Sequence, residues 1–195
     1  MTTLEERVQR IADELEIVRV LNRYAHGIDY GDEDDWLDCF TEDAVWEARS
    51  VASGDTLMRH AGRAALQAFV SGHTRPPELY HKHLVADPIV SVDRDRATAA
   101  CYLLLVVAGP GGQPAIASFG RYRDELHRCA DGKWRIAYRA VEAEAWNPAW
   151  GELRNRRRER LGLSDGDLPG IKQHQEQESE PSATDTERGS TNRKP

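Results

Sequence analysis

The sequence has little cysteine, no long apolar run and no obvious targeting segment. Its three cysteines, Cys39, Cys101 and Cys129, show no CxxC spacing, so we expect buried, inert thiols rather than a disulfide framework or a catalytic cysteine. The longest apolar run, residues 103–108, is far shorter than the roughly 20 residues that span a bilayer. The acidic start of the chain has no apolar signal-peptide core. These absences predict a cytoplasmic protein without a membrane partner.

The chain also lacks an excess of basic charge, since its formal net charge is −7 over 195 residues. General nucleic-acid binding depends on clustered Lys and Arg that neutralise phosphates, so this balance argues against a nucleic-acid partner. The length suits a single domain. A domain of this size buries enough surface to form a core with an internal pocket.

Composition divides the chain into three parts. Residues 1–150 carry the apolar periodicity of a folded domain. Residues 151–163 form a basic C-terminal extension with five arginines between Arg154 and Arg160, which fits either a solvated helix face or a contact with an anion or partner. From Ser164 the chain is rich in Gln, Glu, Ser, Thr and Pro. This composition predicts a disordered polar tail over residues 164–195.

Helix signals dominate the first half of the domain. A capping box of Thr3 and Glu6 marks the start of a long helix, and Gly27 offers an end. Shorter helices are expected at residues 34–40 and 62–71, with a strand at residues 44–49. A single apolar face is predicted for the long helix from residues that recur at three- and four-residue steps: Leu4, Val8, Ile11, Leu15, Val18, Leu21 and Ala25.

The second half is rich in strand signals, at about residues 80–92, 98–108, 115–128 and 134–146. Polar or glycine-rich turns separate these strands. Helices followed by a long antiparallel meander indicate an α+β fold.

Polar side chains on the first of these strands mark one candidate site. Alternation from Tyr80 places His81, His83 and Asp87 on one face together with apolar residues. Such a wall suits a pocket that holds a base in partly dry surroundings, although histidines at a solvent-exposed strand end fit the same pattern. A metal site on these three residues is a further interpretation. No other ligand at matching spacing supports it, so we expect no metal.

The exit of the long helix is the second candidate. Asp29 lies between Ile28 and Tyr30 and is the acid best placed to turn inward. A carboxylate beside a histidine can hold the imidazole in one tautomer and stabilise its charged form. The acids at residues 32–35 are better explained as a solvated helix start.

Several short motifs resemble those of the SnoaL-like family of the NTF2-like superfamily. Residues 23–32 (RYAHGIDYGD), then Trp36 and residues 40–44 (FTEDA), are similar to its opening motif. The segments GR at 62–63, HLVAD at 83–87, GRYRD at 120–124 and DGKWRI at 131–136 continue the pattern in order. Each motif alone is weak, but five in order over about residues 5–146 are specific to the superfamily.

This resemblance implies a cone-shaped α+β barrel in which a curved antiparallel sheet wraps around helices and encloses a pocket. Within the superfamily the chain resembles the scytalone dehydratases, the lindane dehydrochlorinase and the bile-acid dehydratases. These enzymes use an Asp at the exit of the first helix and a His on the following long strand, without metal or organic cofactor. Asp29 and His83 fall on those positions. The second pocket histidine of scytalone dehydratases is absent, and Tyr24 replaces a lysine of the dehydrochlorinase, so neither substrate carries over.

The expected function is therefore that of a cofactor-free lyase or isomerase, of the dehydratase type, acting on a small cyclic or polyketide-like substrate. His83 would remove a proton, Asp29 would orient His83, and Tyr24 would hydrogen-bond the substrate oxygen. Candidate substrate-binding residues are His81, Trp36, Trp46, Phe119 and Trp146.

Two other functions remain open for the same fold. One is a non-catalytic small-molecule-binding module, and the other is the small subunit of a ring-hydroxylating dioxygenase. Fold alone does not decide among them. The resemblance also implies a homodimer or homotrimer.

Overall fold

The computed structural model describes residues 2–109 and 112–147. The predicted basic extension and polar tail lie outside these residues. The elements, in chain order, are α1 (Leu4–Tyr30), α2 (Glu33–Asp38), β1 (Phe40–Ser50), β2 (Thr56–Ala61), α3 (Arg63–Ser71), β3 (His81–Asp93), β4 (Arg96–Ala108), β5 (Pro114–Arg128) and β6 (Trp134–Trp146).

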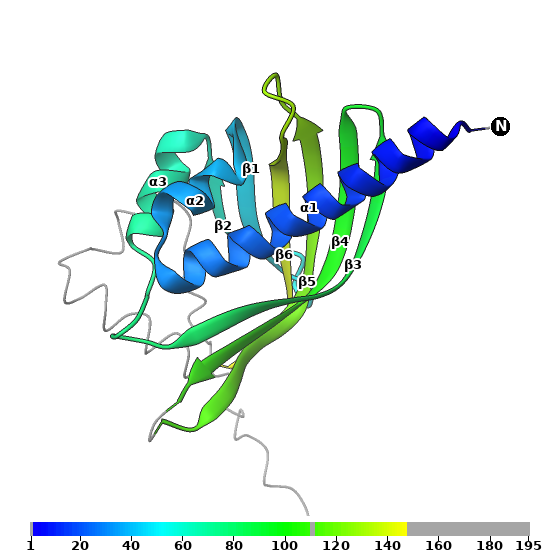
Figure 1. Cartoon of the computed structure of the whole chain (residues 1–195). Helices are drawn as coiled ribbons and strands as arrows, with labels where there is room; N and C mark the ends of the chain where they lie inside the picture. The colour runs from blue at the N-terminus through cyan, green and yellow to red at the C-terminus, as the bar shows by residue number, and fades with distance from the viewer. Residues whose placement is uncertain (1, 110–111, 148–195) are drawn as a thin grey trace, which may run out of the picture.

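The strands form one curved sheet in the order β2-β1-β6-β5-β4-β3. All neighbouring strands are antiparallel except β1 and β6, which are parallel. The long helix α1 crosses one face of the sheet, and α2 and α3 lie near its β1–β2 end (Figure 1). The expected α+β class with a curved sheet is confirmed, and the sheet does not close into a full barrel. Among the described residues, no helix is long and apolar enough to cross a membrane.

The capping box at the start of α1 is confirmed, but its predicted end is wrong. Thr3 and Glu6 exchange the two expected hydrogen bonds, at 2.7 and 3.1 Å. The helix continues past Gly27 to Gly31, which caps it in the left-handed region at φ 76°. Gly27 instead allows a close helix contact, because a Cβ there would lie 2.9 Å from the Cβ of Trp36 in α2.

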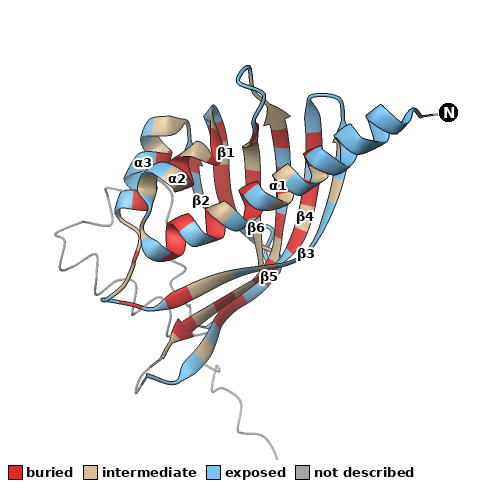
Figure 2. Cartoon of the chain, in the orientation of Figure 1, coloured by how far each residue is buried: buried red, intermediate tan, exposed pale blue. Residues whose placement is uncertain are grey.

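The prediction of a single inward-facing apolar stripe on α1 is wrong for its first half. Leu4, Val8, Ile11 and Leu15 are exposed. The helix turns a different side to the sheet, which buries Asp13, Ile17, Val20, Leu21, Tyr24, Ala25 and Ile28. Figure 2 shows this change along the helix, from exposed first turns to buried later ones.

Asp13 explains part of this orientation. Its carboxylate is buried and accepts a hydrogen bond from the indole N–H of Trp134 at 3.2 Å. It also forms an ion pair with Arg128 at 2.7 Å. A buried carboxylate is tolerated only when it is paired in this way. Asp13 therefore attaches α1 to β5 and β6 through polar contacts, in addition to the apolar packing of the helix.

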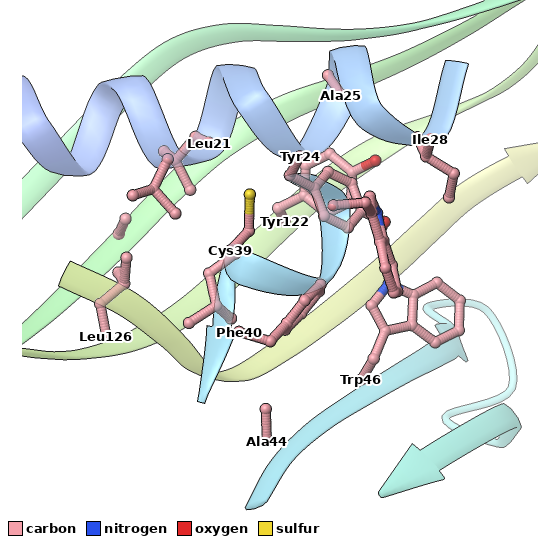
Figure 3. Packing of buried hydrophobic residues seen from close by; sticks show 14 of the residues in the cluster. Leu21, Tyr24, Ala25, Ile28, Cys39, Phe40, Ala44, Trp46, Tyr122 and Leu126 are labelled. Atoms are coloured by element: carbon pink, nitrogen blue, oxygen red, sulfur yellow. The ribbon is translucent and has the colours of Figure 1, made fainter. Parts of the chain in front are cut away.

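Aromatic rings fill the core between α1, α2 and the sheet. Tyr24 packs against Trp36, Phe40 and Tyr122, with ring centroids 5.6–5.9 Å apart. The labelled side chains in Figure 3 show Tyr24, Tyr122, Phe40 and Trp46 gathered below α1. Because these rings are contributed by helices and strands alike, they join the helical layer to the sheet.

Two of the three cysteines also belong to this core. Cys39 and Cys101 are free and buried, and Cys129 is half-buried. Burial raises the pKa of the Cys39 thiol to about 12 and that of Cys101 to about 11. Both thiols are therefore protonated at neutral pH and are poor nucleophiles.

Candidate functional site: an aspartate–histidine pair

The candidate site lies where the last turn of α1 meets the start of β3. Asp29 is 3% exposed and His83 is half-buried. The Nδ1 of His83 lies 2.7 Å from Oδ1 of Asp29, and the backbone N–H of His83 donates to both carboxylate oxygens at 3.1 Å. The structure thus brings together the two predicted residues, which are 54 positions apart in sequence.

The hydrogen bond determines which imidazole nitrogen is basic. A carboxylate oxygen accepts hydrogen bonds, so Nδ1 of His83 carries the shared proton. In the neutral ring, Nε2 then holds the lone pair. The two hydrogen bonds from the backbone N–H of His83 hold the Asp29 carboxylate in place. The carboxylate in turn fixes the orientation of the His83 ring through Nδ1.

His81 lies beside the pair and is fully buried. Its Nε2 is 3.5 Å from the same Asp29 oxygen. Burial, reinforced by the neighbouring His83, lowers the pKa of His81 to about 4. His81 is therefore neutral at neutral pH. One carboxylate lies against two imidazoles, and it forms its short hydrogen bond with His83.

A third histidine, His73, was not found by sequence reasoning. It follows α3, and its ring centroid lies 5.2 Å from that of His81 and 5.7 Å from that of His83. Its Nδ1 is 2.9 Å from the carbonyl oxygen of Thr74. A carbonyl only accepts, so Nδ1 of His73 is also protonated. No periodicity marks His73, because it lies in an irregular segment before two prolines.

Rings continue from the histidines toward β1 and β2. Phe69 contacts His73 with centroids 5.7 Å apart, and His60 and Trp46 each lie 4.7 Å from Phe69. Trp46, a predicted pocket residue, thus belongs to a continuous set of rings that ends at His83. His60 is a second member that the sequence did not suggest, because β2 was not predicted.

Tyr24 lies in the core and meets this set of rings at Trp46. Its hydroxyl accepts a hydrogen bond from the Trp46 indole N–H at 3.0 Å. Burial raises the pKa of Tyr24, and the nearby Arg139 opposes this effect. Among its described contacts, none is to Asp29 or His83. Trp36 is likewise buried in the core, against Tyr24, Phe40 and Phe69.

Arg139 on β6 is a buried charge that the sequence analysis did not single out. Its guanidinium is fully buried and forms a two-point ion pair with Asp124, at 2.7 and 2.9 Å. It also lies over the rings of Tyr24 and Tyr122, at 4.0 and 4.2 Å from their centroids. Alternation from the buried Trp134 and Ile136 would turn residue 139 outward, but the pairing of β5 with β6 is irregular between Glu125 and Leu126, and this irregularity brings Arg139 inward.

Strand register decides the position of the two remaining predicted wall residues. His83 pairs with Leu105, Leu105 with Ser118, and Ser118 with Trp146. Directly paired residues point to the same face of a sheet, so Trp146 shares the face of His83, three strands away. Phe119 belongs to the neighbouring row, with Leu84 and Leu104.

The expectation that Phe119 lines the pocket is therefore wrong. Its row points to the opposite face of the sheet, and its side chain is 47% exposed. Successive residues of a strand alternate between faces. Ser118 is therefore on the face of the site, and Phe119, the next residue, is on the opposite face.

Asp87 also departs from its predicted position. The pairing of β3 with β4 shifts between Ala86 and Ile89, and Asp87 takes a positive φ of 51°. This irregularity ends the alternation that began at His81, and Asp87 is exposed. The carboxylate that meets the histidines is Asp29 from α1.

A metal ion could be held by Asp29, His81 and His83. Their candidate ligand atoms all lie within 4.8 Å of one another. The 2.7 Å separation between Asp29 and His83 is a hydrogen-bond distance, whereas two ligands on one zinc ion lie about 3.3 Å apart for bonds near 2 Å. The observed arrangement fits a shared proton better than a shared cation.

Two surface hollows of about 240 and 210 Å³ lie elsewhere. One is lined by residues of β3, β4 and β5 near Asp93 and Arg96, and the other lies between α1 and Trp134. Neither is lined by Asp29, His81 or His83.

Comparison with known proteins gives the family. A model of the SnoaL-like domain matches residues 9–140. The chain belongs to the SnoaL-like family. This confirms the resemblance drawn from the short motifs, and the solved structures below agree with the NTF2-like fold. No curated protein matches the chain by sequence.

Three solved structures illustrate the similarity. The SnoaL-like chain is 24% identical to a protein of unknown function from Mycobacterium tuberculosis, solved as an Asp-to-Asn variant, with a TM-score of 0.67 over 89% of this chain and 99% of that one. An NTF2-like protein with a cystatin-like fold from Novosphingobium aromaticivorans is 25% identical, with a TM-score of 0.63 over 78% and 97%. The beta subunit of a putative aromatic-ring-hydroxylating dioxygenase from the same organism is 16% identical, with a TM-score of 0.62 over 72% and 94%. The first and third similarities show the fold alone.

Proposed function

We propose that this SnoaL-like protein is a cofactor-independent lyase or isomerase in which His83 is the general base. One observation carries the proposal: the 2.7 Å hydrogen bond between Nδ1 of His83 and the buried carboxylate of Asp29. Such a bond leaves Nε2 as the basic nitrogen and stabilises the imidazolium that forms when it accepts a proton.

In the proposed reaction, Nε2 of His83 removes a proton from a carbon next to a carbonyl group. The electron pair moves toward the carbonyl oxygen, and either a leaving group departs from the neighbouring carbon or the proton returns at another position. Asp29 does not itself transfer the proton. It balances the charge on His83 while the reaction proceeds. The neighbouring rings of His73 and Phe69 suit a small cyclic or polyketide-like substrate, because flat rings pack well on such a wall.

A substrate-independent probe tests the base directly. 5-Nitrobenzisoxazole loses a proton from carbon to a base, its N–O bond breaks, and the coloured cyanophenolate is released. We expect His83→Gln to lower this rate to that of the control without protein. Asp29→Asn should lower it by about 10²–10⁴-fold, the usual range for general-base catalysis. The rate of the double variant should be little lower than that of His83→Gln alone, because residues that act as one unit fail together.

The matched control is His26→Gln, which alters an exposed histidine on α1. Its rate should equal that of the unaltered protein. A rate that survives His83→Gln would place the base elsewhere. The tautomers can be read separately from long-range ¹H–¹⁵N spectra, in which His83 and His73 should both carry the proton on Nδ1.

A rival function is that of a dioxygenase small subunit, in which catalysis belongs to a larger iron-containing chain, and the structure is similar to one solved dioxygenase beta subunit. At 16% identity this similarity supports only the fold. A protein of that kind should co-purify with the larger chain and should show no effect of His83→Gln on its assembly. A binding module without chemistry should retain a ligand, identified by mass spectrometry, and leave it unchanged.

A further inference from the structure

The first half of α1 carries an apolar stripe that takes no part in the core formed by the described residues. Leu4, Val8, Ile11 and Leu15 are 76%, 57%, 66% and 49% exposed. At 100° per residue, the stripe lies about 140° around the helix from the buried side that includes Ile17. Large apolar side chains exposed as a contiguous line mark an interaction surface more often than scattered ones do.

The spacing of the stripe is that of a two-helix seam. Its residues follow one another at steps of four, three and four, which is the alternation of a and d positions in a coiled coil. A stripe with this spacing packs best against another helix with the same spacing. The same helix in a second copy of the chain satisfies this condition.

The charges beside the stripe favour an antiparallel pair. Arg7 and Glu14 occupy the same flank, at successive g positions of the heptad. When two copies pair in opposite directions, their g flanks face each other. Arg7 of each copy then lies opposite Glu14 of the other, which makes two favourable pairs related by a two-fold axis. Within one helix the two residues are about 10 Å apart along the axis and do not meet.

The shape of the molecule agrees with this direction. The first turns of α1 extend beyond the β3–β4 hairpin in Figure 1, and Figure 2 shows them exposed. In an antiparallel pair each sheet lies beyond the N-terminus of the other helix. In a parallel pair both sheets would lie at the same end of the seam.

We propose that the Leu4–Leu15 stripe of α1 binds the same stripe of a second copy as an antiparallel helix pair. The proposal does not depend on the chemistry assigned to His83. The contact is small compared with obligate dimer interfaces, so it should dissociate on dilution.

Sedimentation velocity of the full-length protein over a range of concentrations tests this proposal. The unaltered protein should shift from monomer to dimer, and Ile11→Glu should raise the dissociation constant by about a hundredfold or more, since it places a carboxylate in the seam. The matched control is Ile89→Glu. Ile89 is an equally large side chain on β3, 75% exposed, and its substitution should leave the dimer intact.

Charge exchange tests the direction of pairing. Arg7→Glu alone and Glu14→Arg alone should each weaken the dimer, and the double variant should restore it. Rescue of this kind requires contact between copies, because the two residues do not meet within one helix. A protein that stays monomeric up to about 1 mM, a dimer broken by Ile89→Glu but not by Ile11→Glu, or a double variant without rescue would each overturn the proposal.

Discussion

Removing one partner of the Arg139–Asp124 ion pair should be among the most damaging single changes to this fold. Both side chains are fully buried, and the guanidinium lies between two tyrosine rings. Burial by itself lowers the pKa of Arg139. The adjacent Asp124 carboxylate raises this pKa by more than burial lowers it, so Arg139 remains a cation. Asp124→Leu leaves this cation in the core without a counter-charge. The expected loss in the free energy of unfolding is about 3–5 kcal/mol.

A double-mutant cycle gives the comparison. Arg139→Met alone leaves the Asp124 carboxylate buried and unpaired, so it should also cost about 3–5 kcal/mol. The combination Asp124→Leu/Arg139→Met removes both charges and should lose less than either single change. Urea unfolding can be followed by the fluorescence of Trp36 and Trp134, which are both buried. If the two losses simply add, the charges do not interact as the geometry requires.

Two further predictions concern His81 and Gly27. The pKa of His81 is about 4 in the folded protein and about 6.5 in an unfolded chain, so the unfolded state takes up the proton first as the pH falls. His81 should therefore reduce stability by about 2 kcal/mol between pH 7 and pH 5, and urea titrations of His81→Phe should show a correspondingly weaker pH dependence; an unchanged dependence would place the proton uptake elsewhere. Gly27→Ala should lower stability by about 1–3 kcal/mol, because its Cβ would lie 2.9 Å from that of Trp36. A raised melting temperature would instead mean that the gain in helix propensity exceeds the steric cost.

Local patterns were sufficient for most of the architecture. The capping box of Thr3 and Glu6 predicted the start of α1, and strand-rich segments separated by turn signals predicted β3, β4, β5 and β6 to within two residues. Strand β2 was missed because its residues 56–61 show no clear alternation. In the structure its Thr56, Leu57 and Arg59 are exposed, and only His60 is buried.

The candidate site was predicted in part. Asp29 and His83 were each singled out by their position in the sequence and were assigned to one pair by the resemblance, and the structure places them at hydrogen-bond distance. His73 could not be found, because a histidine in an irregular segment has no pattern to mark it. Asp87 was expected beside His81 and His83, but the irregular pairing of β3 turned it outward.

The sequence by itself determined the helical and strand periodicities, the start of α1 and the residue types from which a general base could be built. Only the tertiary structure decided which side of α1 is buried, since this helix has two apolar sides and periodicity cannot choose between them. Strand register across β3, β4, β5 and β6 likewise decided that Trp146 shares a face with His83 and that Phe119 does not. These choices depend on contacts between segments far apart in the chain, where a shift of one residue exchanges the two faces of a strand. The hydrogen bond between Asp29 and His83 likewise depends on the tertiary structure, because it forms only where the end of α1 lies against the start of β3.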